Sequence, residues 1–237
     1  MNKIVVKNVS KAYKDVKALD NISLEILENK ITGLLGTNGA GKSTLIKILT
    51  GEIKPDNGTI SIFGIDIKNI DEIRKIVNVS PQESAIISNL YENLEFFEHL
   101  YGINDAKLID DIMMLFNLKE FKNKRSKTLS GGYKKRLSIA ISLITRPRIL
   151  FLDEPTLGLD IIARRDLWRI KTKISMSTTI VLTSHYLEEI ESLCEDVIIL
   201  SKGHVASKGT VNDIKELSGC DSFEDAFVKI IGESDEI

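Results

Sequence analysis

One short segment constrains this chain more than any other. Residues 36–43 read G-T-N-G-A-G-K-S and fit the pattern G-x-x-x-x-G-K-[ST]. The apolar run Ile31 to Leu35 precedes the segment, and a run with helical character that begins at Ser43 follows it. In such a setting, glycines let successive backbone N–H groups curl toward a phosphate, and the helix adds the positive end of its dipole. The segment therefore predicts a binding loop for a nucleoside triphosphate.

The residues of this loop have expected roles. Lys42 is expected to reach the β- and γ-phosphates, and the Ser43 hydroxyl to ligate Mg²⁺. Further contacts to the nucleotide are expected from Gly36, Thr37, Asn38, Gly39, Ala40, Gly41 and Thr44. The alternative is a chance glycine-rich turn, against which the flanking strand and helix argue. The motif alone leaves the class of nucleotide-binding protein open.

The distribution of apolar residues favours an α/β fold. Runs of strand length recur at Ile4 to Val6, Ile22 to Ile26, Ile31 to Leu35, Ile149 to Leu152, Thr179 to Thr183 and Val197 to Leu200. Several are apolar throughout, as in a parallel sheet covered on both faces. Between Gln82 and Arg146 the spacing becomes helical, in three stripes that we expect to pack in the core: Leu90, Leu94, Phe97 and Tyr101; Leu108, Ile112, Met113 and Phe116; Leu137, Ile141 and Ile144.

These patterns predict one domain with a helical insertion. Residues 1–82 and 146–215 would form the α/β core, and residues 83–145 a helical subdomain. Residues 216–237 would form a short acidic tail, with a helix around Phe223 to Ile231 and a frayed end. The apolar segment Ala85 to Tyr91 is either an exposed docking patch or a buried loop.

Composition excludes several classes of protein. The net charge of −2 gives no overall reason to expect a nucleic-acid partner. Two cysteines, Cys194 and Cys220, are too few for a disulfide scaffold and suit a reducing compartment. No segment reaches the roughly 18 uninterrupted apolar residues that a membrane-spanning helix needs. We therefore expect a cytoplasmic protein that reaches a membrane only by docking.

Two carboxylates follow the apolar run Ile149 to Leu152. In an open α/β sheet, ligands bind outside the carboxyl ends of the strands. Asp153 is therefore placed to hold Mg²⁺, and Glu154 to orient or deprotonate an attacking water. Acidic residues also end strands at ordinary turns, but here the pair completes the site that Lys42 begins.

A further motif specifies the class. Residues 129–136 read L-S-G-G-Y-K-K-R and open the third helical stripe. They resemble the signature L-S-G-G-Q of the ATP-binding cassette (ABC) family. Ser130 is expected to cap the helix, and its hydroxyl with the Gly131 and Gly132 amides would form a second anion-binding helix start.

The resemblance extends from Ile4 to Thr210. It implies a P-loop NTPase core with a parallel sheet, an antiparallel N-terminal β subdomain and a helical insertion subdomain. Tyr13 matches the aromatic residue that stacks on adenine, and Gln82 the glutamine that senses Mg²⁺ and the attacking water. Asp160 matches the loop aspartate that crosses to a partner subunit, and His185 the histidine that contacts the γ-phosphate. His99 and His204 have no such match and are expected to be surface or packing residues.

One position departs from the family pattern. Tyr133 stands where the signature has glutamine, whose side chain contacts the nucleotide held by the opposite subunit. The backbone amides of the helix start survive this change, so anion binding should persist while the polar contact is in doubt.

The resemblance implies an ATPase that uses ATP and Mg²⁺, with Lys42, Gln82, Glu154 and His185 as catalytic residues. Two subunits would pair head to tail, as a homodimer or a heterodimer, with the P-loop of one facing residues 130–132 of the other. A transmembrane permease would dock near Ile86 and Ile87 and hold the protein on the inner face of the cell membrane. The chain would then contact the membrane only through the permease, and no nucleic acid.

The kind of transporter is less specified. Residues 91–102 and 223–229 resemble segments of bacterial exporter cassettes of the drug and antibiotic-resistance type, which work with a separately encoded permease. Export is therefore favoured. The transported substrate is expected to be selected by the permease rather than by this chain. The rival classes are a soluble ABC-type ATPase that acts on ribosomes or nucleic acid, and a small-molecule kinase or GTPase that shares only the P-loop.

Overall fold

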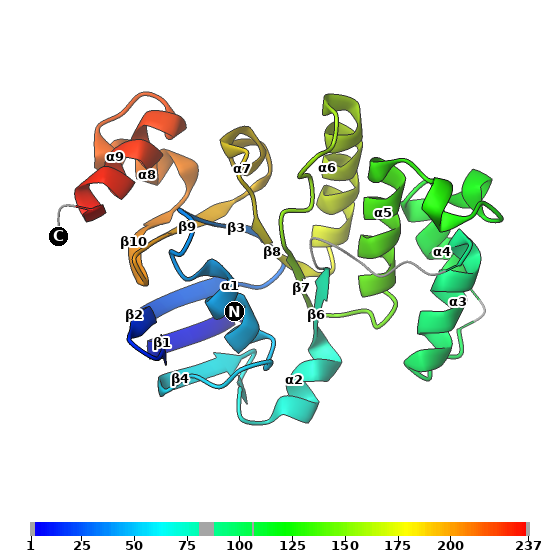
Figure 1. The fold of residues 1–237 in the computed structure, drawn as a ribbon, viewed down its shortest axis with the longest axis horizontal. Coiled ribbons are helices and arrows are strands. Elements are labelled where there is room, and N and C mark those ends of the chain that lie inside the picture. The colour runs from blue at the N-terminus through cyan, green and yellow to red at the C-terminus, as the bar shows by residue number, and fades with distance from the viewer. Residues whose placement is uncertain (1–2, 81–87, 106, 236–237) are drawn as a thin grey trace.

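The structure, a computed structural model, describes residues 3–80, 88–105 and 107–235. It contains two β-sheets (Figure 1). The antiparallel sheet has the order β2 (Val16–Leu27), β1 (Lys3–Tyr13), β4 (Asn57–Ile62), β5 (Ile65–Asp66). The central sheet has the order β10 (His204–Gly209), β9 (Asp196–Ser201), β3 (Ile31–Gly36), β8 (Thr179–Thr183), β7 (Ile149–Leu152), β6 (Val77–Ser80). Its strands pair in parallel except at the β9–β10 edge.

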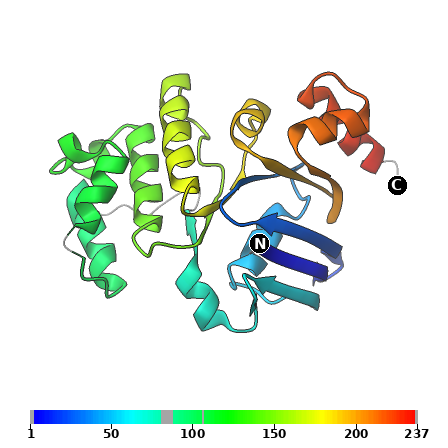
Figure 2. The ribbon, with the colours of Figure 1, turned by 180° about the vertical axis from the view of Figure 1, so that it is seen from behind.

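Helices surround the central sheet and extend from one end of it. Figures 1 and 2 show α1 between the two sheets, and α3, α4 and α5 gathered away from the antiparallel sheet. The described helices are α1 (Lys42–Leu49), α2 (Ile70–Ile76), α3 (Leu90–Leu100), α4 (Leu108–Leu115), α5 (Gly131–Ser142), α6 (Ile161–Ser175), α7 (Leu187–Leu193), α8 (Val211–Ser218) and α9 (Phe223–Asp235). Two 3-10 turns, η1 (Lys119–Phe121) and η2 (Ser126–Thr128), lead into α5. The predicted α/β fold, with its parallel core sheet and antiparallel subdomain, is confirmed.

The inner strands of the central sheet are mostly apolar because both faces of the sheet are buried. Side chains alternate along a strand, so neighbouring residues enter different cores. On β7, Ile149 and Phe151 pack with α1 and the antiparallel sheet, whereas Leu150 and Leu152 pack with the helices of the opposite face. This double burial fixes the strand ends from which the site is built.

Three parts of the fold differ from expectation. The fourth position of the first helical stripe packs less than expected, because α3 ends at Leu100 and Tyr101 beyond it is 44% exposed, whereas Phe97 packs against the core as predicted. Strands β4, β5, β6 and β10 were not predicted, since β4 and β10 carry polar residues and glycine and β5 and β6 are short. Helix α9 runs to Asp235, beyond the expected end at Ile231.

The C-terminal helix is part of the packed domain. Its residues Phe223, Ala226 and Ile231 are buried in the core cluster that covers the helical face of the central sheet. Among the described residues, no helix combines the length and the apolar character needed to cross a bilayer.

Candidate active site

The loop between β3 and α1 has the curled conformation that its glycines predict. Gly36, Gly39 and Gly41 have φ values of 147°, 82° and 105°, which L side chains rarely adopt. The Lys42 ammonium donates to the carbonyls of Gly36 (2.7 Å) and Thr37 (2.9 Å). Lys42 is therefore held across the curve of the loop, where phosphate oxygens would lie.

Neighbouring strands clamp both ends of the loop. A Cβ at Gly36 would lie 2.3 Å from the Leu200 carbonyl oxygen of β9, and one at Gly41 would lie 2.5 Å from the Ala18 carbonyl oxygen of β2. Only glycine fits at these two positions. The antiparallel sheet thus contributes directly to the shape of the loop.

The loop and the start of α1 fit a polyphosphate. Helix α1 is described in full and has no acidic residue in its first turn, and its N-cap Gly41 supplies no capping side chain. The first N–H groups of such a helix are left for another acceptor, and its dipole favours an anion. Thr37, Asn38 and Gly39 are exposed, so the loop is accessible.

Two neighbouring strand ends position the predicted carboxylates. The Asp153 N–H donates to the Ser80 carbonyl of β6 (3.2 Å). Thr183, the last residue of β8, accepts from the Glu154 N–H (3.0 Å) and donates to Asp153 Oδ1 (2.7 Å). Glu154 has a φ of 45°, a left-handed conformation that turns the chain sharply after β7. Thr183 was not predicted as a site residue, although its place at a strand end was a signal.

Glu154 and His185 are brought together from adjacent strand ends. His185 Nε2 lies 2.6 Å from Glu154 Oε1, with side chains 47% and 17% exposed, respectively. Partial exposure lets water reach the carboxylate. A base, a polarising side chain and an accessible position are what hydrolysis by an activated water requires.

Lys42 belongs to the same electrostatic group. Burial lowers the pKa of Lys42, and the carboxylates of Glu154 and Asp153 oppose that shift. Lys135 of α5 also interacts electrostatically with Asp153 and Glu154. It was not predicted as a site residue, although it lies in the basic run 134–136. Burial lowers the pKa of Lys135 to about 8 against the attraction of Asp153. The nucleotide loop and the carboxylates of Asp153 and Glu154 therefore form one site.

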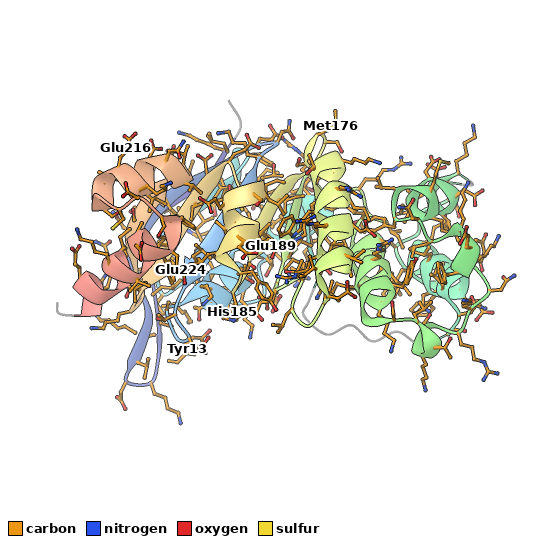
Figure 3. The ribbon with its side chains drawn as sticks, turned by 90° about the horizontal axis from the view of Figure 1, so that it is seen from above. Tyr13, Met176, His185, Glu189, Glu216 and Glu224 are labelled. Carbon is orange, nitrogen blue, oxygen red and sulfur yellow. The ribbon has the colours of Figure 1, made fainter. Side chains whose placement is uncertain are left out.

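A cavity of about 290 Å³ adjoins the loop. Its lining comes from β3, the loop, the segment after β8, α7 and α9: Leu35, Gly36, Thr37, Asn38, Ser184, His185, Leu187 and Phe227. Phe227 of α9 was not expected near the site. Figure 3 shows Tyr13 and His185 toward the same edge of the molecule. Tyr13 ends β1, is 47% exposed, and belongs to the hairpin whose second strand contacts Gly41.

The second predicted anion site lies elsewhere. Ser130 occupies the N-cap position of α5, but its side chain makes no capping hydrogen bond with a described residue, contrary to expectation. A Cβ at Gly132 would lie 3.1 Å from Ala163 Cβ, so this helix start faces the start of α6. There Asp160 caps α6 by accepting from the Ala163 N–H (2.8 Å). None of residues 130–132 or Asp160 is among the described residues that line the loop cavity.

The family model described as ABC transporter matches residues 19–157. This chain belongs to the ABC transporter family. The daunorubicin resistance ATP-binding protein DrrA3 of Streptomyces coeruleorubidus is 35% identical over 93% of this chain and 72% of its own length. Several longer relatives match as well, and this chain spans only 9% to 29% of their length.

Solved structures agree with the assignment. An ATP-binding subunit of an ABC transporter has a TM-score of 0.84 and 28% identity over 96% of this chain and 98% of its own. An ATP-binding cassette in a dimeric, post-hydrolysis state with ADP and Pi has a TM-score of 0.77 and 26% identity over 87% of this chain and 98% of its own. The chain is thus an ABC ATP-binding subunit, an ATPase that uses ATP and Mg²⁺. Subunits of this family dimerise and work with membrane permeases, and the soluble rival class is not favoured.

In this ABC subunit, the unusual signature residue has a local packing role. The Tyr133 ring lies 4.0 Å from the Phe121 ring between centroids, and the Arg136 guanidinium lies 4.9 Å from the Tyr133 centroid. Arg136 in turn pairs with Asp166 of α6 (2.8 Å). The side chain at this position therefore stabilises the helical subdomain of its own subunit.

Some predicted residues are not tested by this structure. Gln82, Ile86 and Ile87 lie outside the described residues. Within the described part, no group of three or more His, Cys, Asp and Glu side chains is arranged to hold a metal ion. The exposed Ser43 hydroxyl and the half-buried Asp153 carboxylate fit Mg²⁺, an ion that keeps water and phosphate oxygens among its ligands.

Proposed function

We propose that this subunit drives export through a separately encoded permease, and that two copies close around two ATP molecules to do so. The observation that carries the proposal is the 2.6 Å contact between Glu154 and His185, beside the Lys42 loop and apart from the α5 start. Each copy would supply half of each site. Export is supported by the similarity to a daunorubicin resistance ATP-binding protein.

The site geometry supports the following catalytic roles. Lys42 and the amides of residues 36–41 would hold the β- and γ-phosphates, and Glu154 would take the proton of the attacking water. Ser43, Asp153 and Gln82 would hold Mg²⁺, which neutralises developing charge when it is bound. Tyr13 would stack on the adenine ring.

His185 has a further consequence for Glu154. In this structure its imidazole occupies one oxygen of the carboxylate. We infer that His185 turns toward the γ-phosphate when nucleotide enters, which frees Glu154 to act as a base. Hydrolysis would then be coupled to the arrival of substrate.

The partner subunit would complete the site. Ser130, Gly131 and the nearby Asp160 lie at exposed positions beside one another, away from their own loop cavity. In a head-to-tail pair they would face the γ-phosphate on the partner's loop. Charge-assisted hydrogen bonds contribute about 1.5–3 kcal/mol each, so loss of the γ-phosphate is enough to reopen a balanced dimer. One chain carries a full set of motifs, which permits a homodimer as well as a heterodimer.

The permease would dock on the helical side, near Ile86 and Ile87, and place the subunit on the inner face of the cell membrane. The segment is apolar in sequence and adjoins Gln82, which would link the nucleotide to the docking point. Replacing both isoleucines with aspartate should abolish co-purification with the permease and leave ATP binding intact. Retained co-purification would place the docking site elsewhere.

Glu154→Gln tests the central part of the proposal. General bases contribute about 10²- to 10⁴-fold to rate, so turnover should fall by that order while ATP binding persists. By light scattering after gel filtration, the variant should be a dimer with ATP and Mg²⁺ and a monomer without them. Glu120→Gln, an exposed change in the helical subdomain, is the matched control. An elution volume that does not depend on ATP would count against the proposal.

A further inference from the structure

A buried carboxylate on α7 collects four hydrogen bonds. Glu189 is 0% exposed. Lys171 Nζ and Trp168 Nε1 of α6 donate to Glu189 Oε1, at 2.5 Å and 3.2 Å. Thr156 Oγ1 and Ser184 Oγ donate to Oε2, both at 2.6 Å. Figure 3 shows Glu189 well inside the outline of the molecule, whereas Met176 and Glu216 lie at its edge.

The two hydroxyl donors come from the loops that carry the proposed catalytic pair. Thr156 follows Glu154 by two residues, and Ser184 immediately precedes His185. One carboxylate oxygen therefore ties together two segments that leave different strands, β7 and β8. Through Lys171 and Trp168 the same carboxylate holds α6, the helix that Asp160 caps.

The charge state of the cluster fixes the direction of each hydrogen bond. Burial would raise the pKa of Glu189, but Lys171 and the two hydroxyls outweigh it, so the pKa lies below its ordinary value. An ionised carboxylate can only accept hydrogen bonds, so the hydroxyl groups of Thr156 and Ser184 must both donate. This fixes the orientation of each hydroxyl hydrogen. Lys171 is itself 0% exposed. An apolar pair of similar volume would often be at least as stable, so stability alone does not explain a buried ion pair here.

We propose that Glu189 is a positioning residue for ATP hydrolysis. Through its hydrogen bonds to Thr156 and Ser184, it fixes the position of Glu154 relative to His185. This inference rests on the catalytic roles proposed above for Glu154 and His185. Glu189 itself is 0% exposed and is not among the described residues that line the loop cavity. Its effect is to keep the base and the histidine at contact distance while the loops respond to nucleotide.

The expected effect is on turnover rather than on binding. A displacement of about 1 Å at a catalytic group can cost about 100-fold in rate. The double variant Thr156→Val, Ser184→Ala removes both links and leaves the Lys171–Glu189 pair in place. Its kcat should fall about 10- to 100-fold, with the KM for ATP changed less than about threefold.

The only tryptophan in the sequence provides a second readout. Trp168 donates to Glu189, so its emission reports on this cluster. In the unmodified protein, a non-hydrolysable ATP analogue should shift that emission. The loops that carry Thr156 and Ser184 would move when the analogue binds, and this movement would displace the Glu189 carboxylate that Trp168 contacts. In the double variant the shift should shrink while analogue affinity is kept, which a role in folding alone would not produce.

The test uses three further variants. Glu188→Gln, an exposed neighbour on α7, is the control and should keep normal turnover. Glu189→Gln leaves Lys171 buried without its counter-ion and can fail to fold for that reason. The positioning role is therefore tested on the double hydroxyl variant, after thermal unfolding has shown that this protein is folded. Glu154→Gln is measured in parallel.

The outcomes separate this inference from the proposed function. A folded Thr156→Val, Ser184→Ala protein with kcat within about twofold of normal, beside an inactive Glu154→Gln, would overturn the positioning role alone. Normal turnover in Glu154→Gln would overturn the catalytic roles, and the positioning role with them. Loss confined to KM would also contradict it.

Discussion

Gly36→Ala tests how tightly the nucleotide loop is clamped. The new Cβ would lie 2.3 Å from the Leu200 carbonyl oxygen and 2.9 Å from Ala40 Cβ. Ordinary carbon–oxygen contacts in sheets are about 3.3–3.6 Å, so the backbone must move by about 1 Å. The obstacle is backbone of β9, which pairs with Gly36 and cannot turn away as a side chain could.

The magnitude follows from two contributions. A non-glycine residue held in a rare backbone region costs about 1–3 kcal/mol, and overpacking a tight site adds about 1–3 kcal/mol. For a domain of this size, each kcal/mol lowers Tm by about 2–4 °C. A cost of about 4 kcal/mol therefore predicts a Tm about 8–16 °C lower, with weaker ATP binding because the loop shifts.

Gly39→Ala is the matched control. Gly39 also has a positive φ, of 82°, but its Cβ would meet no described atom within 4 Å. It should cost only the left-handed conformation, about 1–2 kcal/mol, and lower Tm by about 2–8 °C. Both variants are compared by thermal unfolding and by calorimetric titration with ATP. A Gly36→Ala protein at least as stable as Gly39→Ala would refute the clamped-loop reasoning.

Three further predictions concern two residues of the site and one buried thiol. Lys42→Ala should lower ATP affinity at least about tenfold, since charge-assisted hydrogen bonds contribute about 1.5–3 kcal/mol each; unchanged affinity by calorimetry would refute its role. Tyr13→Ala should weaken the affinity for ATP by about 5- to 150-fold, as expected for one base–aromatic stack of about 1–3 kcal/mol, and Tyr13→Trp should retain binding; equal affinity of all three proteins would exclude stacking. Burial raises the pKa of Cys194 to about 12, so its thiol stays neutral at pH 8 and should resist iodoacetamide until the protein is unfolded in urea. Mass spectrometry would contradict this if native and unfolded protein were labelled at Cys194 at the same rate.

Local patterns predicted the strands that carry Asp153, Glu154 and His185. The runs Ile149 to Leu152 and Thr179 to Thr183 are β7 and β8 with the expected bounds, because strands buried on both faces are apolar over most of their length. The grouping of Lys42, Asp153, Glu154 and His185 also followed, since strand ends on one edge of a parallel sheet meet. That Glu154 and His185 touch could not be read from their spacing.

What escaped prediction depends on long-range packing. The donors to Glu189 come from α6 and from two loops, and none of them was predicted as a site residue. From the sequence, Tyr133 in place of glutamine indicated only the loss of a polar contact. In the structure its ring packs on Phe121, a contact that the residue type at one position does not predict. Tyr101 continued a helical pattern past the end of α3, where the chain no longer turns toward the core.

A cross-link between the nucleotide loop and the start of α5 tests the central claim most directly. Asn38→Cys and Ser130→Cys are introduced together in the Glu154→Gln protein, since both positions are exposed and belong to the two halves of the proposed site. With ATP and Mg²⁺, mild oxidation should give a covalent dimer on a non-reducing gel. ATP-free protein should stay monomeric, and so should each variant with only one of the two added cysteines, which also shows that the native Cys194 and Cys220 form no cross-link. A bond formed within one chain, or a dimer that forms equally well without ATP, would contradict the shared site.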